Sequence, residues 1–345
     1  MNNNNKLGDA LANKIFQSVI KSCVLMLNSN ETKEVIRSKK ISSLLYNFLI
    51  SKFDYLLSKN KHLQVLQDGI LGYLPFETLN NKKGNYLVES IDVSYLHSFS
   101  VQKHILNRNY SSKENNVWAM AVTSFSGNPD ALKTKFAINL SDLKTDIYKA
   151  IDEKSNLSNF YKQLGYSTFG NLNEGEKEAR SITSLFLNSK YLTNSECTEQ
   201  NIKLLSETGD LKKYKYLHFS THGIAVPEIP ELSALVLFNN FAEGAADNFL
   251  TMNEIANLKI EASLVTLSAC ESGLGKVFKG EGVFGISHAF IAAGANSTAV
   301  SLWQVDESAT YEFMTQLYTL LQTGKYSTSQ AINMVKRNFY QEKWV

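Results

Sequence analysis

The stretch from Ala262 to Ala269 is the sequence feature that most constrains the fold. Its residues, Ala-Ser-Leu-Val-Thr-Leu-Ser-Ala, form a nearly continuous apolar run of strand length. Such a run is typical of a strand in a parallel sheet that helices cover on both faces. The run ends at Cys270, so we expect this cysteine at the carboxyl end of a buried strand.

Alternating strand and helix patterns surround that run. They predict strands over 117–122, 214–221, 233–238 and 298–303, and helices over 174–187, 252–258, 283–293 and 307–321. This order is typical of right-handed strand-helix-strand units. We therefore predict an α/β fold, an α/β/α sandwich with a central, mostly parallel sheet.

The first hundred residues show a different pattern. Helical spacing of apolar residues predicts short helices over 10–27 and 44–57. Leu63 to Leu66 then has the composition of a strand, Asp68-Gly69 that of a tight turn, and Ile70-Leu71 that of a returning strand. These signals predict a β-hairpin, followed by another strand over 91–96.

Composition narrows the class of function. Lys and Arg number 35 against 33 Asp and Glu, and this near balance argues against direct binding of nucleic acid or an anionic membrane. No apolar stretch reaches the ~20 residues that cross a bilayer, and no signal segment opens the chain. Three widely spaced cysteines favour a reducing compartment over a disulfide framework. We expect a cytoplasmic protein.

Two residues with catalytic chemistry follow predicted strands. His222 comes directly after the strand over 214–221, and Cys270 directly after the apolar run. Because the carboxyl ends of parallel strands meet at one edge of a sheet, an imidazole and a thiol would face each other there if the two strands are neighbours. An imidazole raises the thiolate fraction of a nearby cysteine and can protonate a leaving amine. The two residues stand 48 positions apart, close to the ~50 that separate His and Cys in caspases.

Glycine after the histidine fits the same chemistry. Gly223 lets a backbone N–H approach a substrate closely, and with the N–H of Cys270 it would form an oxyanion hole. The alternative is a structural His and Cys that are simply buried, since free cysteine is often packed in cores.

Several ordered motifs together resemble one protein family. They are Tyr216-Leu217-His218-Phe219-Ser220-Thr221-His222-Gly223, Leu267-Ser268-Ala269-Cys270-Glu271-Ser272-Gly273-Leu274-Gly275, Gly280-Glu281-Gly282, Ala293-Gly294-Ala295 through Ser301-Leu302-Trp303-Gln304-Val305-Asp306, and the upstream Asp68-Gly69-Ile70-Leu71-Gly72-Tyr73-Leu74-Pro75-Phe76-Glu77. In these residues the chain resembles the CHAT family, caspase-like cysteine peptidases related to separase. The resemblance runs from about residue 35 to the end.

The resemblance implies a caspase-like fold and cleavage of a peptide bond by a His-Cys dyad, with His222 and Cys270 at the dyad positions and with no metal or cofactor. It also implies a division into an N-terminal helical segment (1–34), an N-terminal half of the CHAT region (35–165) and a caspase-like catalytic half (166–345). Family members commonly follow a helical-repeat region, so we expect a regulatory protein or such a region as a partner.

Four further residues are candidates for the substrate pocket. Asp306 and Glu307 follow the strand over 298–303 and would suit a Lys or Arg side chain, although Asp306 also fits a helix N-cap. Trp303 would line the groove or fill the core. Glu281 would orient the loop after the nucleophile or stabilise the next helix N-terminus.

Other histidines and cysteines favour structural roles. His218 and His222 lie four residues apart on a strand, about 13 Å, which is too far for both to bind one zinc ion. We expect His218 to be packed or hydrogen-bonded, Cys23 to be buried, and Cys197 to take no part in catalysis.

The sequence thus predicts a cysteine endopeptidase that acts on a protein or peptide substrate, and the resemblance implies that it acts under regulation in bacterial defence or cell death. Two alternatives remain. One is a catalytically inactive caspase-like scaffold that binds partners through its N-terminal helices and sheet edge. The other is an enzyme of a different thiol class, such as an acyl transferase.

Overall fold

The structure is a computed structural model. It describes residues 18–20, 22–23, 32–110, 113–125, 145–150, 157–164, 166, 169–226, 229–238, 247–268, 276–278, 282–302 and 305–341. The chain divides into two compact units. One comprises Met1–His104, Val277–Val283 and Ser329–Val345, and the other Ile105–Lys276 and Phe284–Thr328.

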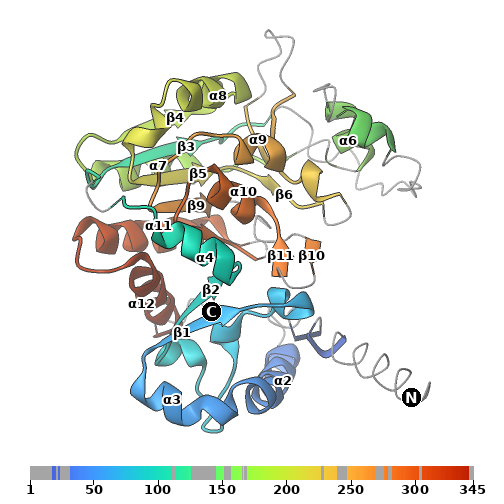
Figure 1. The fold of residues 1–345 in the computed structure, drawn as a ribbon, viewed down its shortest axis with the longest axis vertical. Helices are drawn as coiled ribbons and strands as arrows, with labels where there is room; N and C mark the ends of the chain where they lie inside the picture. The colour runs from blue at the N-terminus through green and yellow to red at the C-terminus, as the bar shows by residue number, and fades with distance from the viewer. Residues whose placement is uncertain are drawn as a thin grey trace. The chain divides into compact units, whose positions relative to one another are not determined.

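The second unit is built on a parallel sheet of five strands. Its strands are β3 (Val117–Ala121), β4 (Lys190–Thr193), β5 (Tyr216–Ser220), β9 (Leu264–Ser268) and β12 (Thr298–Val300). They lie in the order β12-β9-β5-β3-β4, and every neighbouring pair is parallel. Figure 1 shows β4, β3, β5 and β9 in this order. The predicted α/β class is confirmed.

Helices cover both faces of this sheet. They are α7 (Gly175–Ser184), α8 (Glu199–Glu207), α9 (Met252–Ala256), α10 (Ile286–Ala293) and α11 (Glu307–Gln322). On β5, the side chain of His218 contacts Tyr318 of α11, whereas that of Phe219 contacts Phe290 of α10. Because successive side chains of a strand point to opposite faces, α11 and α10 lie on opposite sides of the sheet. This explains why β5 is buried along its whole length.

A small antiparallel sheet adjoins the end of β5. Its strands are β6 (Gly223–Ile224), β7 (Ala234–Val236) and β8 (Phe249–Thr251), in that order. The strand predicted over 233–238 therefore exists, but in this sheet rather than the central one. Its apolar side packs with α6 (Ser158–Gln163), where the ring of Tyr161 stacks on that of Phe249. Two further strands, β10 (Lys276–Phe278) and β11 (Gly282–Phe284), pair with each other.

The first unit holds a separate core. Its helices are α2 (Thr32–Leu49), α3 (Asp54–Lys59), α4 (Phe99–Leu106) and α12 (Thr328–Gln341), and its strands are β1 (His62–Leu66) and β2 (Asp92–Leu96). The amide of Asn333 on α12 bonds to both the N–H and the C=O of Val93, at 3.0 Å each, so it completes the outer edge of β2. Buried apolar side chains from α2, α3 and the segment around Leu74 to Val93 fill the space between these elements.

The predicted hairpin after β1 is wrong. β1 pairs in parallel with β2, with Leu63 opposite Val93, and residues Gly69–Tyr73 form a 3-10 helix instead of a returning strand. Gly69 does have the positive φ of +57° that its turn signal suggested. The turn, however, leads into a helical loop.

The helix predicted over 10–27 lies mostly outside the described residues, of which 18–20 and 22–23 are helical. The remaining elements follow the predicted ranges with shifted ends. The helix predicted over 44–57 is divided between the end of α2 and α3, and the strand predicted over 298–303 is only half-buried in its described part, β12. No described helix is both long enough and apolar enough to span a membrane.

Candidate active site

The carboxyl ends of β5 and β9 meet at one edge of the central sheet. The two strands are direct neighbours, and the last residues of each, Ser220 and Ser268, are paired in register. His222 stands two residues beyond Ser220, and Cys270 two residues beyond Ser268. Cys270 lies outside the described residues, as do Glu281 and Trp303.

The segment that carries His222 is held by β7. The hydroxyl of Thr221 donates to the carbonyl of Val236, and the N–H of Val236 donates to the carbonyl of His222 at 2.8 Å. Gly223 then begins β6 opposite Leu235. The backbone on both sides of the imidazole is therefore fixed by the small sheet.

The imidazole of His222 has a defined orientation. Its Nε2 lies 2.7 Å from the carbonyl oxygen of Gly170. A carbonyl oxygen can only accept, so Nε2 carries the hydrogen and, in the neutral ring, Nδ1 carries the lone pair. The rings of Phe125 and Phe169 lie against it, with centroids 4.7 and 5.4 Å away.

Burial also sets the proton affinity of this ring. Desolvation lowers the pKa of His222 from its usual 6.5, and the Gly170 hydrogen bond and the charge of Glu307 oppose that shift only in part. The neutral imidazole, which can accept a proton, is therefore the form that this environment favours near neutral pH.

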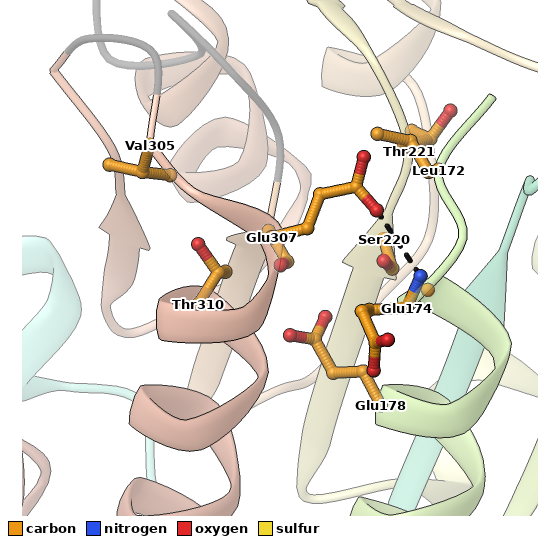
Figure 2. A pocket seen from close by; sticks show the side chains of 10 residues that line it. Leu172, Glu174, Glu178, Ser220, Thr221, Val305, Glu307 and Thr310 are labelled. Atoms are coloured by element: carbon orange, nitrogen blue, oxygen red, sulfur yellow. Dashed lines mark hydrogen bonds between the residues drawn. The ribbon is translucent and has the colours of Figure 1, made fainter. Parts of the chain in front are cut away.

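A cleft opens beside these strand ends. It is shallow and partly open to solvent, and it is lined by Leu172, Glu174, Gly175, Glu178, Ser220, Thr221, Ser268, Val305, Glu307 and Thr310. Figure 2 shows Glu307 extending from the start of α11 to the backbone of Glu174, with Glu178 below it on α7. Three carboxyl side chains thus line a small space next to the strand ends.

Asp306 and Glu307, which the sequence predicts together for the pocket, have different roles in the structure. Glu307 lines the cleft, and its Oε2 accepts from the N–H of Glu174 at 3.2 Å. Asp306 instead caps α11, where its Oδ1 accepts from the N–H of Ala309 at 2.9 Å. The N-cap reading of Asp306 is therefore confirmed.

A buried polar network lies under the cleft. Nε2 of His218 is 3.0 Å from Oε1 of Glu178, and its Nδ1 is 2.7 Å from the hydroxyl of Thr266, which is also 2.7 Å from the hydroxyl of Tyr318. His218 is fully buried. The expectation that His218 is a hydrogen-bonded structural residue is confirmed.

The two cysteines that the structure describes are both inaccessible. Burial raises the pKa of the Cys23 thiol to about 11 and that of Cys197 to about 12, so both remain thiols near neutral pH. Within the described ranges, no three His, Cys, Asp or Glu side chains are grouped as metal ligands.

Sequence reasoning missed two contributors to this site. The Gly170 carbonyl is a backbone group that any residue could supply, so no residue type indicates it. Glu178 lies within the helix predicted over 174–187, where a polar residue is ordinary. The patterns that could have indicated it are its place in the first turn of that helix and the buried His218 on the neighbouring strand.

A comparison with models of protein families agrees with these motifs. The model of the CHAT domain matches residues 39–345. No curated protein matches the sequence significantly. Among solved structures, a chain of the Saccharomyces cerevisiae separase–securin complex is similar with a TM-score of 0.39 and 15% sequence identity, over 76% of this chain and 13% of that one.

Proposed function

Because the chain belongs to the CHAT-domain family, we propose that it is a cysteine endopeptidase in which Cys270 is the nucleophile and His222 the proton-transfer group. The substrate would be a protein or peptide. We also propose, on the family resemblance, that such cleavage serves regulated proteolysis in bacterial defence or cell death.

One observation carries the proposal: the paired register of Ser220 and Ser268 at the ends of adjacent parallel strands. Each candidate follows its strand end by two residues, and two residues of extended chain span at most about 7 Å. The imidazole and the thiol would therefore work at the same edge of the sheet, where α/β proteins place their ligands.

The orientation of His222 supports one route for the proton. With its Nε2–H bonded to Gly170, the ring would receive the thiol proton of Cys270 at Nδ1. The thiolate then attacks the peptide carbonyl carbon, and the carbonyl electron pair moves to oxygen. The imidazolium returns its proton to the leaving amine as the C–N bond breaks.

A second half-reaction restores the enzyme. Water would attack the thioester while His222 takes its proton, and the acid product leaves as the Cys270 thiol forms again. The N–H groups of Gly223 and Cys270 would bind the oxyanion in both steps, each worth roughly 3 kcal/mol of transition-state stabilisation.

Two substitutions test the dyad. Cys270→Ala and His222→Ala should each abolish cleavage of a mixed peptide library, read by mass spectrometry, because each removes a reacting group. Cys197→Ser is the matched control, since that thiol is buried and donates a hydrogen bond to the Ala121 carbonyl at 3.6 Å. Cleavage that persists in folded Cys270→Ala protein would refute the proposal.

The inactive scaffold remains the second candidate, and one observation favours it. The side chains of Ile36 and Leu44 on α2 are 52% and 68% exposed and stand eight residues apart on one helix face, as in surfaces that bind partners. An electrophilic peptide probe separates the two candidates. Labelling of Cys270 supports the peptidase, and its failure in folded protein supports the scaffold.

A further inference from the structure

We propose that Asn194 is a positioning residue of the candidate site, because its amide holds the chain segments that orient the His222 imidazole. This inference rests on the proposed peptidase, since the direction of the imidazole affects the rate only if His222 moves the proton of Cys270. Three features support it: the origin of the contacts on the imidazole, the hydrogen bonds of the Asn194 amide, and the backbone conformation at that position.

The contacts that orient the imidazole come from two short segments, 123–125 and 169–172. The carbonyl of Gly170 accepts the hydrogen bond of Nε2, and the rings of Phe125 and Phe169 lie against the imidazole. Neither segment belongs to a helix or a strand. Their positions therefore depend on hydrogen bonds outside the regular ladders of the sheet.

The two segments are bonded to each other. The N–H of Leu172 donates to the carbonyl of Thr123 at 3.1 Å, and the N–H of Phe125 donates to Oδ1 of Asn171 at 3.3 Å. Gly170 stands directly before Asn171. A shift of the first segment would therefore move the carbonyl that holds the imidazole.

Asn194 anchors the first segment. Its Oδ1 accepts from the N–H of Thr123 at 2.9 Å and from the N–H of Ser124 at 3.1 Å. The hydroxyl of Thr123 also donates to Oδ1 at 3.1 Å and accepts from Nδ2 at 2.9 Å. One side chain thus binds both backbone donors that follow Val122 beyond the end of β3.

The backbone at Asn194 is in the left-handed region. The residue follows β4 directly and has a φ of +41°, a conformation that most side chains adopt only at a cost in free energy. Glycine would adopt it readily, but glycine has no amide to hold Thr123 and Ser124. A need for that amide explains why asparagine suits this position.

Asn194 would act on the reaction through His222 alone. It is not one of the described residues that line the cleft, so a substrate bound there meets other side chains. Its loss should therefore change the orientation of the imidazole rather than the binding of the substrate. That expectation separates a positioning role from a substrate contact.

The first test is kinetic and uses Asn194→Gly, which keeps the left-handed backbone accessible but removes the amide. For the peptide that the wild type cleaves fastest, kcat should fall about 10- to 100-fold, because the imidazole loses its fixed direction. KM should change little. Asn194→Asp should restore most of kcat, since a carboxylate oxygen accepts from the same N–H groups. An unchanged kcat in Asn194→Gly would overturn the proposal.

Asn188→Gly is the matched control. Asn188 also has a positive φ, +54°, but its side chain is exposed and bonds to Glu114. This variant makes the same chemical change at the same type of backbone position, and its kcat should equal that of the wild type. Equal losses of kcat in the two glycine variants would refute a specific role for Asn194.

The second test does not depend on turnover. In folded Cys270→Ala protein, the Nε2–H of His222 should give a ring N–H resonance in nitrogen-edited proton NMR, because its hydrogen bond to Gly170 slows exchange with water. Adding Asn194→Gly should remove that resonance, whereas adding Asn188→Gly should keep it. A resonance that persists unchanged without the Asn194 amide would overturn the proposal.

The two readouts separate this proposal from the peptidase itself. If the wild type cleaves no peptide but the ring resonance depends on Asn194, the peptidase is wrong and the orientation of His222 by Asn194 stands. If Cys270 cleaves peptides and Asn194→Gly changes neither kcat nor the resonance, the positioning role is wrong. If Asn194→Gly fails to fold, Asn171→Ala carries both tests, because it removes the acceptor of the Phe125 N–H.

Discussion

At the scale of single residues, His222 shows how position and protonation are fixed by different neighbours. The Gly170 carbonyl selects the nitrogen that carries the hydrogen, whereas the rings of Phe125 and Phe169 pack against the imidazole and bury part of it. The first contact orients the base and the second lowers its pKa. Together they favour a neutral imidazole whose Nδ1 carries a lone pair near neutral pH.

The partly buried environment of His222 predicts a lowered pKa for its ring. Burial favours the neutral ring, so the pKa of His222 should lie below 6.5 in folded Cys270→Ala protein, measured by NMR of the ring protons. The ring is neutral above that pKa and charged below it, so the base function should be lost only as pH falls through a value under 6.5. Phe125→Ala should expose the ring and move the pKa back toward 6.5. A wild-type midpoint at or above 6.5 would contradict this account.

At position 294 the fold requires a glycine, because a side chain there would meet the neighbouring backbone. It ends α10 with a φ of +128°, and a Cβ there would lie 1.9 Å from the carbonyl oxygen of Ile260. Gly294→Ala should therefore lower the free energy of unfolding by about 2 kcal/mol or more, in denaturant titrations.

Gly209→Ala is the control that separates the cost of a positive φ from the cost of a steric clash. Gly209 has a φ of +78° but open space around its Cβ position, so this variant should lose only about 1–2 kcal/mol. Equal losses for the two variants would show that the contact with Ile260 contributes nothing.

The candidate site could be predicted in part from single residues. The sequence indicates His222 because it follows a strand pattern and precedes glycine, and it leaves Asp306 between a pocket residue and a helix N-cap, of which the structure shows the cap. The Gly170 carbonyl was missed because any residue could supply it. Glu178 was missed because its importance comes from His218, which lies on a different element.

At the scale of elements, one polar network joins four pieces of the second unit. Glu178 of α7, His218 of β5, Thr266 of β9 and Tyr318 of α11 are linked by hydrogen bonds in sequence. All four are buried. The network thus fixes the two helices that line the cleft against the two strands whose ends meet there.

Thr266→Val tests this role. It keeps the side-chain shape but removes the hydroxyl that both His218 and Tyr318 contact, so the free energy of unfolding should fall by about 1–3 kcal/mol. Thr319→Val on α11 is the control, since the Thr319 hydroxyl is exposed and bonds only to the carbonyl of Thr315 in its own helix. A loss no larger than that of the control would show that the network does not hold these elements together.

The wrong prediction of a hairpin after β1 is explained by the pairing of strands that lie far apart in the sequence. The signal of Asp68 and Gly69 is local and does describe a turn, but β1 finds its partner in β2, where Leu63 pairs with Val93 much further along the chain. A sequence pattern gives the length of a strand and its buried residues, not its neighbour. The central sheet was easier to predict because continuous apolar runs demand a parallel sheet covered on both sides.

At the scale of the whole molecule, the chain forms two compact units with separate cores. The predicted alternation of strands and helices accounts for the second unit. In its central sheet β5 pairs with β9, although more than forty residues of the chain separate the end of β5 at Ser220 from the start of β9 at Leu264. The boundaries predicted at residues 34 and 165 remain predictions. The candidate site, the cleft and the network beneath it all belong to the second unit.

The central claim is that one sheet edge presents an imidazole and a sulfur to the same peptide bond. A crystal structure of the protein with an electrophilic peptide attached to Cys270 tests it most directly. We predict that Sγ lies within about 4 Å of Nδ1 of His222, with Nε2 still bonded to Gly170. A sulfur on the far side of the sheet, or an imidazole whose Nδ1 faces away from it, would contradict the account.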